Sequence, residues 1–133
     1  MFWIHFWIND SDRWRNAMKK KIICFDLDNV ICRTKKNFYK LSSPNKTIIQ
    51  HINKLYKKGY IIKIFTARFM GRANDDSSKA RKLAKNLTLK QLKNWKLNYH
   101  QVIFGKPSYD VIVDDKSFDF KKNWFKKFVR IYK

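Results

Sequence analysis

The stretch IICFDLDNVIC, residues 22–32, decides the fold, and its two aspartates raise the question of what function they serve. Its first half is a continuous run of apolar, β-forming residues, which is typical of a strand buried on both faces. Asp26 and Asp28 close this run, although the 133-residue chain has 31 Lys+Arg against 10 Asp+Glu and contains no glutamate. Two aspartates at a strand end are weak evidence alone, but in a chain so poor in acids they indicate a functional site.

Strand and helix signals alternate along the rest of the chain. Residues 33–43 have no helical period and predict a loop or hairpin, and Pro44 is expected to open a helix that ends at Gly59. The later elements are a buried strand at 60–65, a helix from 75–77 to 87, a second helical piece from Thr88, strands at 101–104 and 109–113, and an aromatic-faced helix from Ser117. This order predicts an α/β fold: a Rossmann-like parallel sheet with right-handed crossovers and helices on both faces.

The length suits one domain, 18–133, after an N-terminal extension, 1–17, of unknown role. The apolar run at 2–8 is too short for a membrane span and lacks the flanks of a signal peptide. The extension is an upstream addition before Met18, an aromatic flap or an oligomer contact. Two cysteines and no secretion signal favour the cytoplasm, with Cys24 expected to be a small buried side chain.

The net charge of +21 would attract nucleic acid, an anionic membrane or a phosphorylated small molecule. Most of the basic residues are lysine, among many Asn, Ile, Phe and Tyr, which indicates a general compositional drift. Arginine would be expected for bidentate contacts to phosphates or bases. A small phosphorylated substrate is therefore favoured, and nucleic acid stays as an alternative partner.

Polar residues follow four predicted strands, and the carboxyl ends of parallel strands share one edge of a sheet. Carboxylates gathered there would repel one another and need a cation, for which Mg²⁺ is suited because it binds oxygen ligands and phosphates. One carboxylate could attack phosphorus, and a second could protonate the leaving oxygen and then activate water. A hydroxyl and an ammonium could hold the phosphoryl oxygens. The residues concerned are Asp26, Asp28, Thr66, Lys106, Asp114 and Asp115.

The motif order resembles that of the haloacid dehalogenase (HAD) superfamily of phosphotransferases. It comprises Asp-x-Asp at 26–28, hydrophobic-Thr-Ala-Arg ending at residue 68, Gly-Lys-Pro at 105–107 and hydrophobic-Asp-Asp at 114–115. The segments 66–72 and 88–119 are similar to small members without a cap domain that are associated with bacterial capsule and lipo-oligosaccharide synthesis.

This resemblance implies a catalytic set of four residues. Asp26 would be the nucleophile, and Asp28 the general acid/base. Thr66 would hydrogen-bond the phosphoryl group, and Lys106 would offset its charge. One departure concerns the turn after the second aspartate, where many relatives have Gly-Thr and this chain has Asn29-Val30; asparagine tolerates the unusual backbone angles of such a turn.

The resemblance also implies a metal site and a substrate site. The Mg²⁺ ligands would be Asp26, the main-chain carbonyl of Asp28, Asp114 and, directly or through water, Asp115. The substrate would meet Thr66, Ala67, Arg68 and Lys106. Arg68 and Arg72 are equally well explained as solvated loop charges.

The expected function is that of a cytoplasmic, Mg²⁺-dependent HAD-like phosphatase without a cap domain, a hydrolase of phosphoric monoesters. The resemblance suggests a sugar or polyol phosphate of surface-polysaccharide synthesis as substrate. Specificity would come from residues 33–43 and 69–78, from the extension or from a partner subunit in an oligomer. The alternatives are a phosphatase of nucleotides or nucleic-acid ends, and a non-catalytic basic nucleic-acid-binding protein on the same scaffold.

Overall fold

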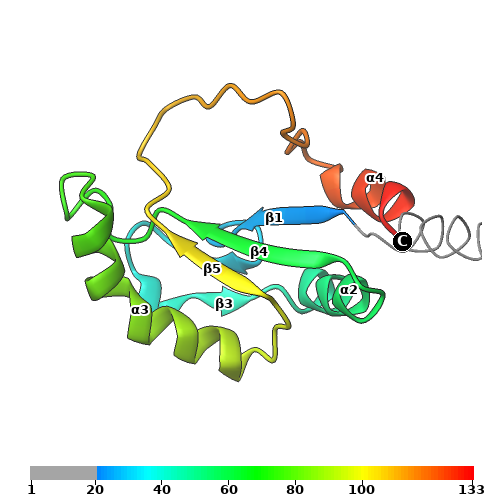
Figure 1. Ribbon diagram of the computed structural model, residues 1–133, viewed down its shortest axis with the longest axis horizontal. Coiled ribbons are helices and arrows are strands. Elements are labelled where there is room, and N and C mark those ends of the chain that lie inside the picture. Colours follow the sequence, from blue (N-terminus) through cyan, green and yellow to red (C-terminus); the bar gives the residue numbers. More distant parts are fainter. Residues whose placement is uncertain (1–20) are drawn as a thin grey trace, which may run out of the picture.

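A computed structural model of the protein describes residues 21–133, so the predicted extension 1–17 lies outside the described residues. Its centre is a parallel sheet in the order β1–β4–β5 (Figure 1). Phe25 of the first strand is paired with Ile64 of the second, which is paired with Val102 of the third. The predicted α/β fold with a parallel sheet is confirmed. The strands are β1 (Ile22–Asp26), β4 (Ile61–Thr66) and β5 (Gln101–Phe104).

Among residues 21–133, three α-helices accompany the sheet: α2 (Lys46–Lys57), α3 (Ser77–Asn94) and α4 (Trp124–Ile131). Asn45 caps α2 by accepting the N–H of Ile48, and Asp76 caps α3 within the predicted start at 75–77. The predicted break at Thr88 is wrong, because α3 runs on without interruption and buries this residue. No helix within residues 21–133 has both the length and the apolar character to cross a membrane.

A second, two-stranded antiparallel sheet is formed by the part of the chain that connects β1 to α2. It consists of β2 (Cys32–Arg33) and β3 (Ser43–Pro44), with the 3₁₀ turn η1 (Tyr39–Leu41) between them. Of the two predicted forms of 33–43, the structure therefore shows a hairpin. Pro44 ends this hairpin instead of opening the helix, which begins at Lys46.

The helices of the described residues cover one face of the sheet, and the helices that the sequence predicted on the second face are not seen among residues 21–133. Because β1, β4 and β5 follow one another in one direction, right-handed crossovers place α2 and α3 on the same side (Figure 1). The side chains facing them, Phe25, Ile62 and Ile64, share one buried core with α2, α3 and Phe128 of α4. On the opposite face of the sheet, the side chains of Ile22, Cys24 and Ile61 are exposed. The prediction that Cys24 is a small buried side chain is therefore wrong.

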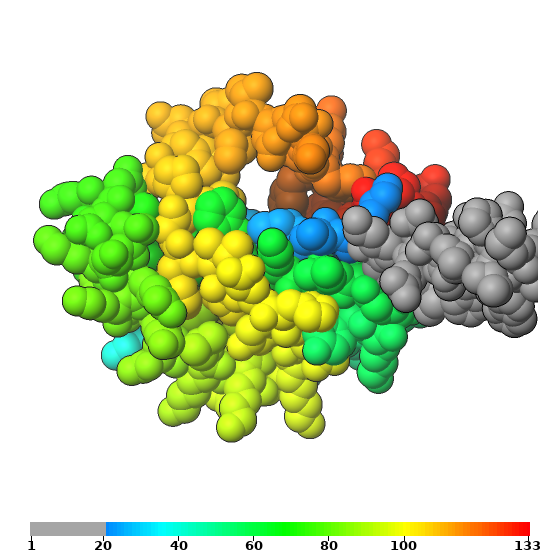
Figure 2. Space-filling model, viewed as in Figure 1, coloured from blue at the N-terminus to red at the C-terminus, as the bar shows by residue number. Residues whose placement is uncertain are grey.

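The predicted fourth strand at 109–113 is absent from the structure, which has no strand after Phe104. Instead, residues 105–118 arch away from the sheet, and an opening separates them from β1 (Figure 2). Val111 is 79% and Val113 is 94% exposed, so neither is packed against the sheet. An apolar β-branched run forms a strand only where it finds a neighbouring backbone, and this run has none here.

Candidate active site

An ion pair joins the ends of the first and third strands. Asp26 is the last residue of β1, and its Oδ2 lies 3.2 Å from Nζ of Lys106, two residues after β5. The other carboxylate oxygen, Oδ1, accepts the N–H of Leu27 at 2.8 Å. The backbone N–H of Lys106 donates to the Thr66 carbonyl of the central strand at 3.1 Å. The carboxyl edge of the sheet thus brings together a carboxylate and an ammonium that are 80 positions apart in the sequence.

Gly105 makes this approach of Lys106 to the sheet edge feasible. Its φ of +98° lies in the region that residues with a Cβ rarely adopt. A Cβ at this position would lie 2.7 Å from Cβ of Ser77, at the start of α3. The glycine of the Gly-Lys-Pro motif is therefore required both by the backbone angle and by the close approach of the helix.

The surroundings of the ion pair raise the pKa values of both partners. Burial raises the pKa of the Asp26 carboxyl, and this effect outweighs the opposing influence of the Lys106 ammonium and of the Leu27 N–H. Burial alone would lower the pKa of Lys106, but its hydrogen bond with Tyr109 and the Asp26 carboxylate raise it overall. Asp26 remains 36% exposed in its side chain, so it can meet a ligand from solvent.

Asp28, in contrast, is fixed by a buried arginine. Nε of Arg68 donates to both carboxylate oxygens at 3.2 and 3.0 Å, and Nη2 donates to Oδ1 at 2.9 Å. The hydroxyl of Thr34 also donates to Oδ1. The side chain of Arg68 is 0% exposed and that of Asp28 is 19% exposed. A guanidinium fork and a hydroxyl thereby hold this carboxylate in one orientation.

The guanidinium of Arg68 also donates hydrogen bonds to other side chains inside the protein. Nη1 donates to Gln91 Oε1 at 2.6 Å and to Thr88 Oγ1 at 3.3 Å, and Nη2 donates to Ser42 Oγ at 3.2 Å. The predicted solvated loop charge is therefore wrong for Arg68, because its side chain is buried and its carboxylate partner is Asp28. The predicted contact of Arg68 with substrate stays a prediction. One pattern in the sequence could have indicated a buried polar partner for Arg68. Ala80, Ala84 and Thr88 are spaced four residues apart, which places the polar Thr88 on the buried face of α3.

The turn after Asp28 has the backbone that the sequence predicted. Asn29 has a φ of +67°, its N–H donates to the Cys32 carbonyl at 2.7 Å, and its side chain accepts the N–H of Thr34 at 3.2 Å. Asparagine can occupy this left-handed conformation more easily than most residues with a side chain. The turn returns the chain to β2 and places Thr34 against Asp28.

Thr66 and Ala67, two of the residues predicted to bind substrate at the end of β4, are less accessible than expected. Thr66 is fully buried, and its hydroxyl accepts the N–H of Arg68 at 3.1 Å, so the structure does not present it to a phosphoryl group. Ala67 packs against the small apolar cluster of Met70, Ala73 and Ala80. These contacts fix the turn that directs Arg68 inwards.

Asp114 and Asp115 do not join the site, because the strand that should carry them is absent. Both are exposed, and Asp114 makes local contacts, accepting the N–H of Lys116 on Oδ1 and the hydroxyl of Ser117 on its carbonyl, each at 3.1 Å. Within residues 21–133 no three His, Cys, Asp or Glu side chains are placed to hold a metal ion. Since Asp26 is paired with an ammonium and Asp114 and Asp115 lie exposed on the segment that leaves the sheet, the described residues do not bring the predicted Mg²⁺ ligand set together.

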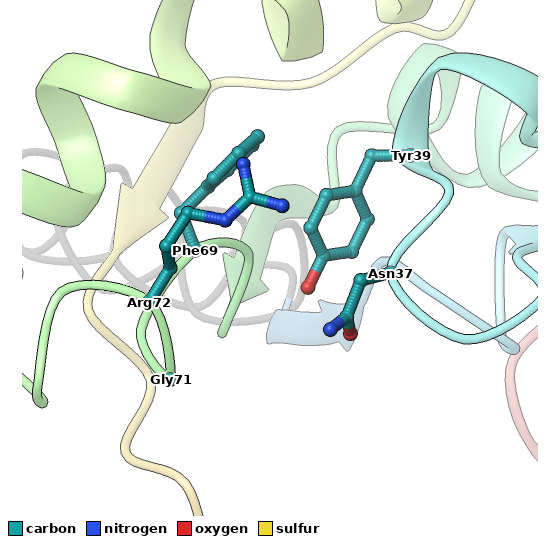
Figure 3. Close-up of a pocket in the computed structure, with 5 residues that line it drawn as sticks. All are labelled: Asn37, Tyr39, Phe69, Gly71 and Arg72. Carbon is teal, nitrogen blue, oxygen red and sulfur yellow. The ribbon is translucent and has the colours of Figure 1, made fainter.

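A pocket of about 280 Å³ opens between η1 and the loop after β4. In Figure 3 the side chains of Tyr39 and Asn37 face those of Phe69 and Arg72 across the opening. The sequence indicated segments 33–43 and 69–78 as the source of specificity, and the pocket joins these two segments. Of the pocket residues the sequence had indicated only Arg72, as either a substrate contact or a solvated charge, because no pattern in the sequence pairs η1 with this loop.

A solved structure is similar to this chain along most of its length. It is the crystal structure of a target protein from Vibrio cholerae, with a TM-score of 0.67 and 24% sequence identity; the match covers 74% of this chain and 81% of that chain. At this identity the likeness shows the α/β fold alone. Neither the comparison with protein-family models nor that with curated proteins finds a match.

Proposed function

We propose that the protein is a cytoplasmic HAD-like phosphatase without a cap domain, which hydrolyses a small phosphoric monoester through an aspartyl phosphate on Asp26. The observation that carries this proposal is the 3.2 Å pair of Asp26 and Lys106 at the carboxyl edge of a parallel sheet. Ligands of open α/β sheets bind at this edge. The segments 27–45 and 67–76, between strands and helices, are too short to contain a cap domain.

The chemistry requires a nucleophile and a countercharge, and the pair supplies both. An oxygen of the Asp26 carboxylate attacks phosphorus, the bond from phosphorus to the ester oxygen breaks, and the leaving alkoxide takes a proton from Asp28 in its predicted acid role. Water then attacks the aspartyl phosphate, which releases inorganic phosphate and restores the carboxylate. The Lys106 ammonium, already beside the nucleophile, offsets the negative charge on the phosphoryl oxygens during both steps.

The acid/base role of Asp28 stays a prediction. Its carboxylate is held by Arg68 and Thr34, so proton transfer would require it to exchange one of these contacts for the leaving oxygen. The contacts of Asp28 also support a second, positioning role. The Asp28–Arg68 pair fixes the loop after β1, and with it the position of the neighbouring Asp26.

The substrate is proposed to be a sugar or polyol phosphate of surface-polysaccharide synthesis. This substrate class is suggested by the resemblance of 66–72 and 88–119 to small HAD members of capsule synthesis that was noted from the sequence. A pocket of about 280 Å³ near the sheet edge supports a small substrate, since ligand sites for small molecules begin at about this size.

The test is a phosphate-release screen of the full chain over sugar phosphates, polyol phosphates and nucleotides, with and without Mg²⁺. Asp26→Asn should abolish turnover while the circular-dichroism spectrum stays unchanged. Asp119→Asn is the matched control, because this exposed aspartate pairs only with the exposed Lys121. Turnover of any ester by Asp26→Asn at the wild-type rate would overturn the nucleophile assignment.

The magnesium requirement is tested separately. The motif order predicts that Asp114→Asn weakens the dependence of kcat/KM on Mg²⁺ concentration. An unchanged titration curve would agree instead with the exposed position of Asp114 and remove it from the site.

A further inference from the structure

The pocket between η1 and the loop after β4 has two aromatic walls and a cationic rim. The rings of Tyr39 and Phe69 lie 5.0 Å apart between centroids at an angle of 51°. The guanidinium of Arg72 lies 4.9 Å from the centre of the Phe69 ring and extends toward Tyr39 across the opening (Figure 3). Such a combination can bind the apolar face of a ring or carbon chain and an anionic group together.

Phe69 occupies this position in a strained backbone conformation. Its φ is +63°, which is rare for a bulky residue and is found mostly where surrounding contacts enforce it. The enforcing contacts are present, since the Phe69 carbonyl accepts the N–H of Ala73 at 3.0 Å and the Ala67 carbonyl accepts that of Met70 at 3.0 Å. Strain of this kind concentrates at ligand sites, which is a second indication of binding independent of the cavity.

Arg72 presents a guanidinium that lacks a carboxylate partner among the described residues. The ion pairs of residues 21–133 are Arg68–Asp28, Lys106–Asp26 and Lys121–Asp119. The side chain of Arg72 is exposed, and its guanidinium stacks on the Phe69 ring. A stacked guanidinium is restricted in orientation and keeps its fork of donors directed at a ligand.

The pocket adjoins the candidate active site through Tyr39. The guanidinium of Arg68, which holds Asp28, lies 5.1 Å from the centre of the Tyr39 ring. Gln91 bridges the two residues, since its Nε2 donates to the Tyr39 carbonyl at 2.7 Å and its Oε1 accepts from Nη1 of Arg68 at 2.6 Å. The pocket wall is therefore built onto the same hydrogen-bond network that fixes Asp28.

We propose that this pocket receives the leaving group of the phosphate ester, and that Arg72 selects leaving groups that carry a second negative charge. The substrate would then be a phosphorylated ring or short carbon chain with an additional carboxylate or phosphate. Tyr39 and Phe69 pack on its carbon skeleton, and Arg72 binds the second anion through two parallel hydrogen bonds. The kinetic test of this inference rests on the proposed phosphatase function. Binding of a doubly anionic ligand in the pocket does not depend on that function.

The experiment compares three six-carbon probes with the full chain: glucose 6-phosphate, 6-phosphogluconate and fructose 1,6-bisphosphate. The wild type should prefer one of the two doubly anionic probes over glucose 6-phosphate by about tenfold or more in kcat/KM, the usual contribution of a charge-assisted bidentate contact. Preference for 6-phosphogluconate would identify a carboxylate as the second anion, and preference for the bisphosphate a phosphate. In Arg72→Met the ratio should fall toward one, whereas Arg81→Met, on the exposed face of α3, should keep it.

Two outcomes separate this inference from the proposed function. If the wild type hydrolyses the esters without preference, or if Arg81→Met changes the ratio as much as Arg72→Met, the pocket assignment is overturned while the phosphatase stands. If no ester is hydrolysed, the phosphatase proposal fails, and calorimetric binding of the same probes decides the pocket. Binding of a doubly anionic probe that Arg72→Met weakens tenfold would retain the pocket, and equal binding by both proteins would overturn it.

Discussion

Replacing Arg68 with methionine should destabilise the protein far more than the loss of a surface charge. The change leaves the Asp28 carboxylate without its guanidinium and removes the donor from Gln91 and Thr88 on the buried face of α3. Removing one partner of a buried ion pair typically costs about 3–5 kcal/mol. Because Asp28 keeps 19% of its side-chain surface, water can partly replace the arginine, and we expect about 3 kcal/mol, the lower end of that range.

Urea unfolding followed by tryptophan fluorescence measures this loss. Lys121→Met is the matched control, since the Lys121–Asp119 pair is 78% and 70% exposed and should contribute at most about 1 kcal/mol. Arg68→Lys should fall between the two, because it keeps the charge but not the fork of donors. In thermal unfolding, a loss of about 3 kcal/mol corresponds to a decrease in Tm of roughly 10 °C for a domain of this size.

A double variant tests the cause of the loss. If the unpaired carboxylate is responsible, Asp28→Asn combined with Arg68→Met should recover part of the stability, which appears as a favourable coupling free energy. Equal losses in Arg68→Met and Lys121→Met, or no coupling with Asp28→Asn, would refute the argument that a buried charge pair organises this site.

Three further predictions follow from the site and its surroundings. Lys106→Met should move the acidic limb of the pH profile of kcat/KM to higher pH, because the ammonium opposes the burial that raises the pKa of Asp26; an unmoved limb would contradict the pairing. Burial lowers the pKa of His51 below its usual 6.5, so folding favours the neutral ring, and unfolding free energy should decline as the pH falls below that value, less steeply in His51→Gln. Gly105→Ala should lower the unfolding free energy by more than about 1 kcal/mol, whereas Gly71→Ala, whose Cβ meets no atom within 4 Å, should change it little; equal effects in urea unfolding would count against the close approach of α3.

Much of the site at the sheet edge was predictable from local sequence. The apolar runs that end at Asp26 and Thr66, the asparagine turn and the glycine before Lys106 each follow from rules that act over a few residues. Parallel pairing then brings Asp26 and Lys106 together, as their positions at strand ends predicted.

The direction of the arginine after β4 was not predictable in this way. Whether Arg68 points to solvent or inwards depends on Thr88 and Gln91 of α3, and on the carboxylate of Asp28 forty residues earlier. Burial of a guanidinium is favourable only when all these acceptors are in place, and the sequence shows none of those distances.

The sequence by itself determined the three strands of the parallel sheet, the start of α3 near Asp76 and the acids and bases at the ends of the strands, because hydrophobic period and turn chemistry act locally. Only the tertiary structure decided which of those residues meet. It paired Asp26 with Lys106 and Asp28 with Arg68, and it left 109–113 without a strand partner and Asp114 in solvent. The physical reason is that a strand end becomes part of a site only when its backbone finds a neighbour, and that pairing is a long-range event.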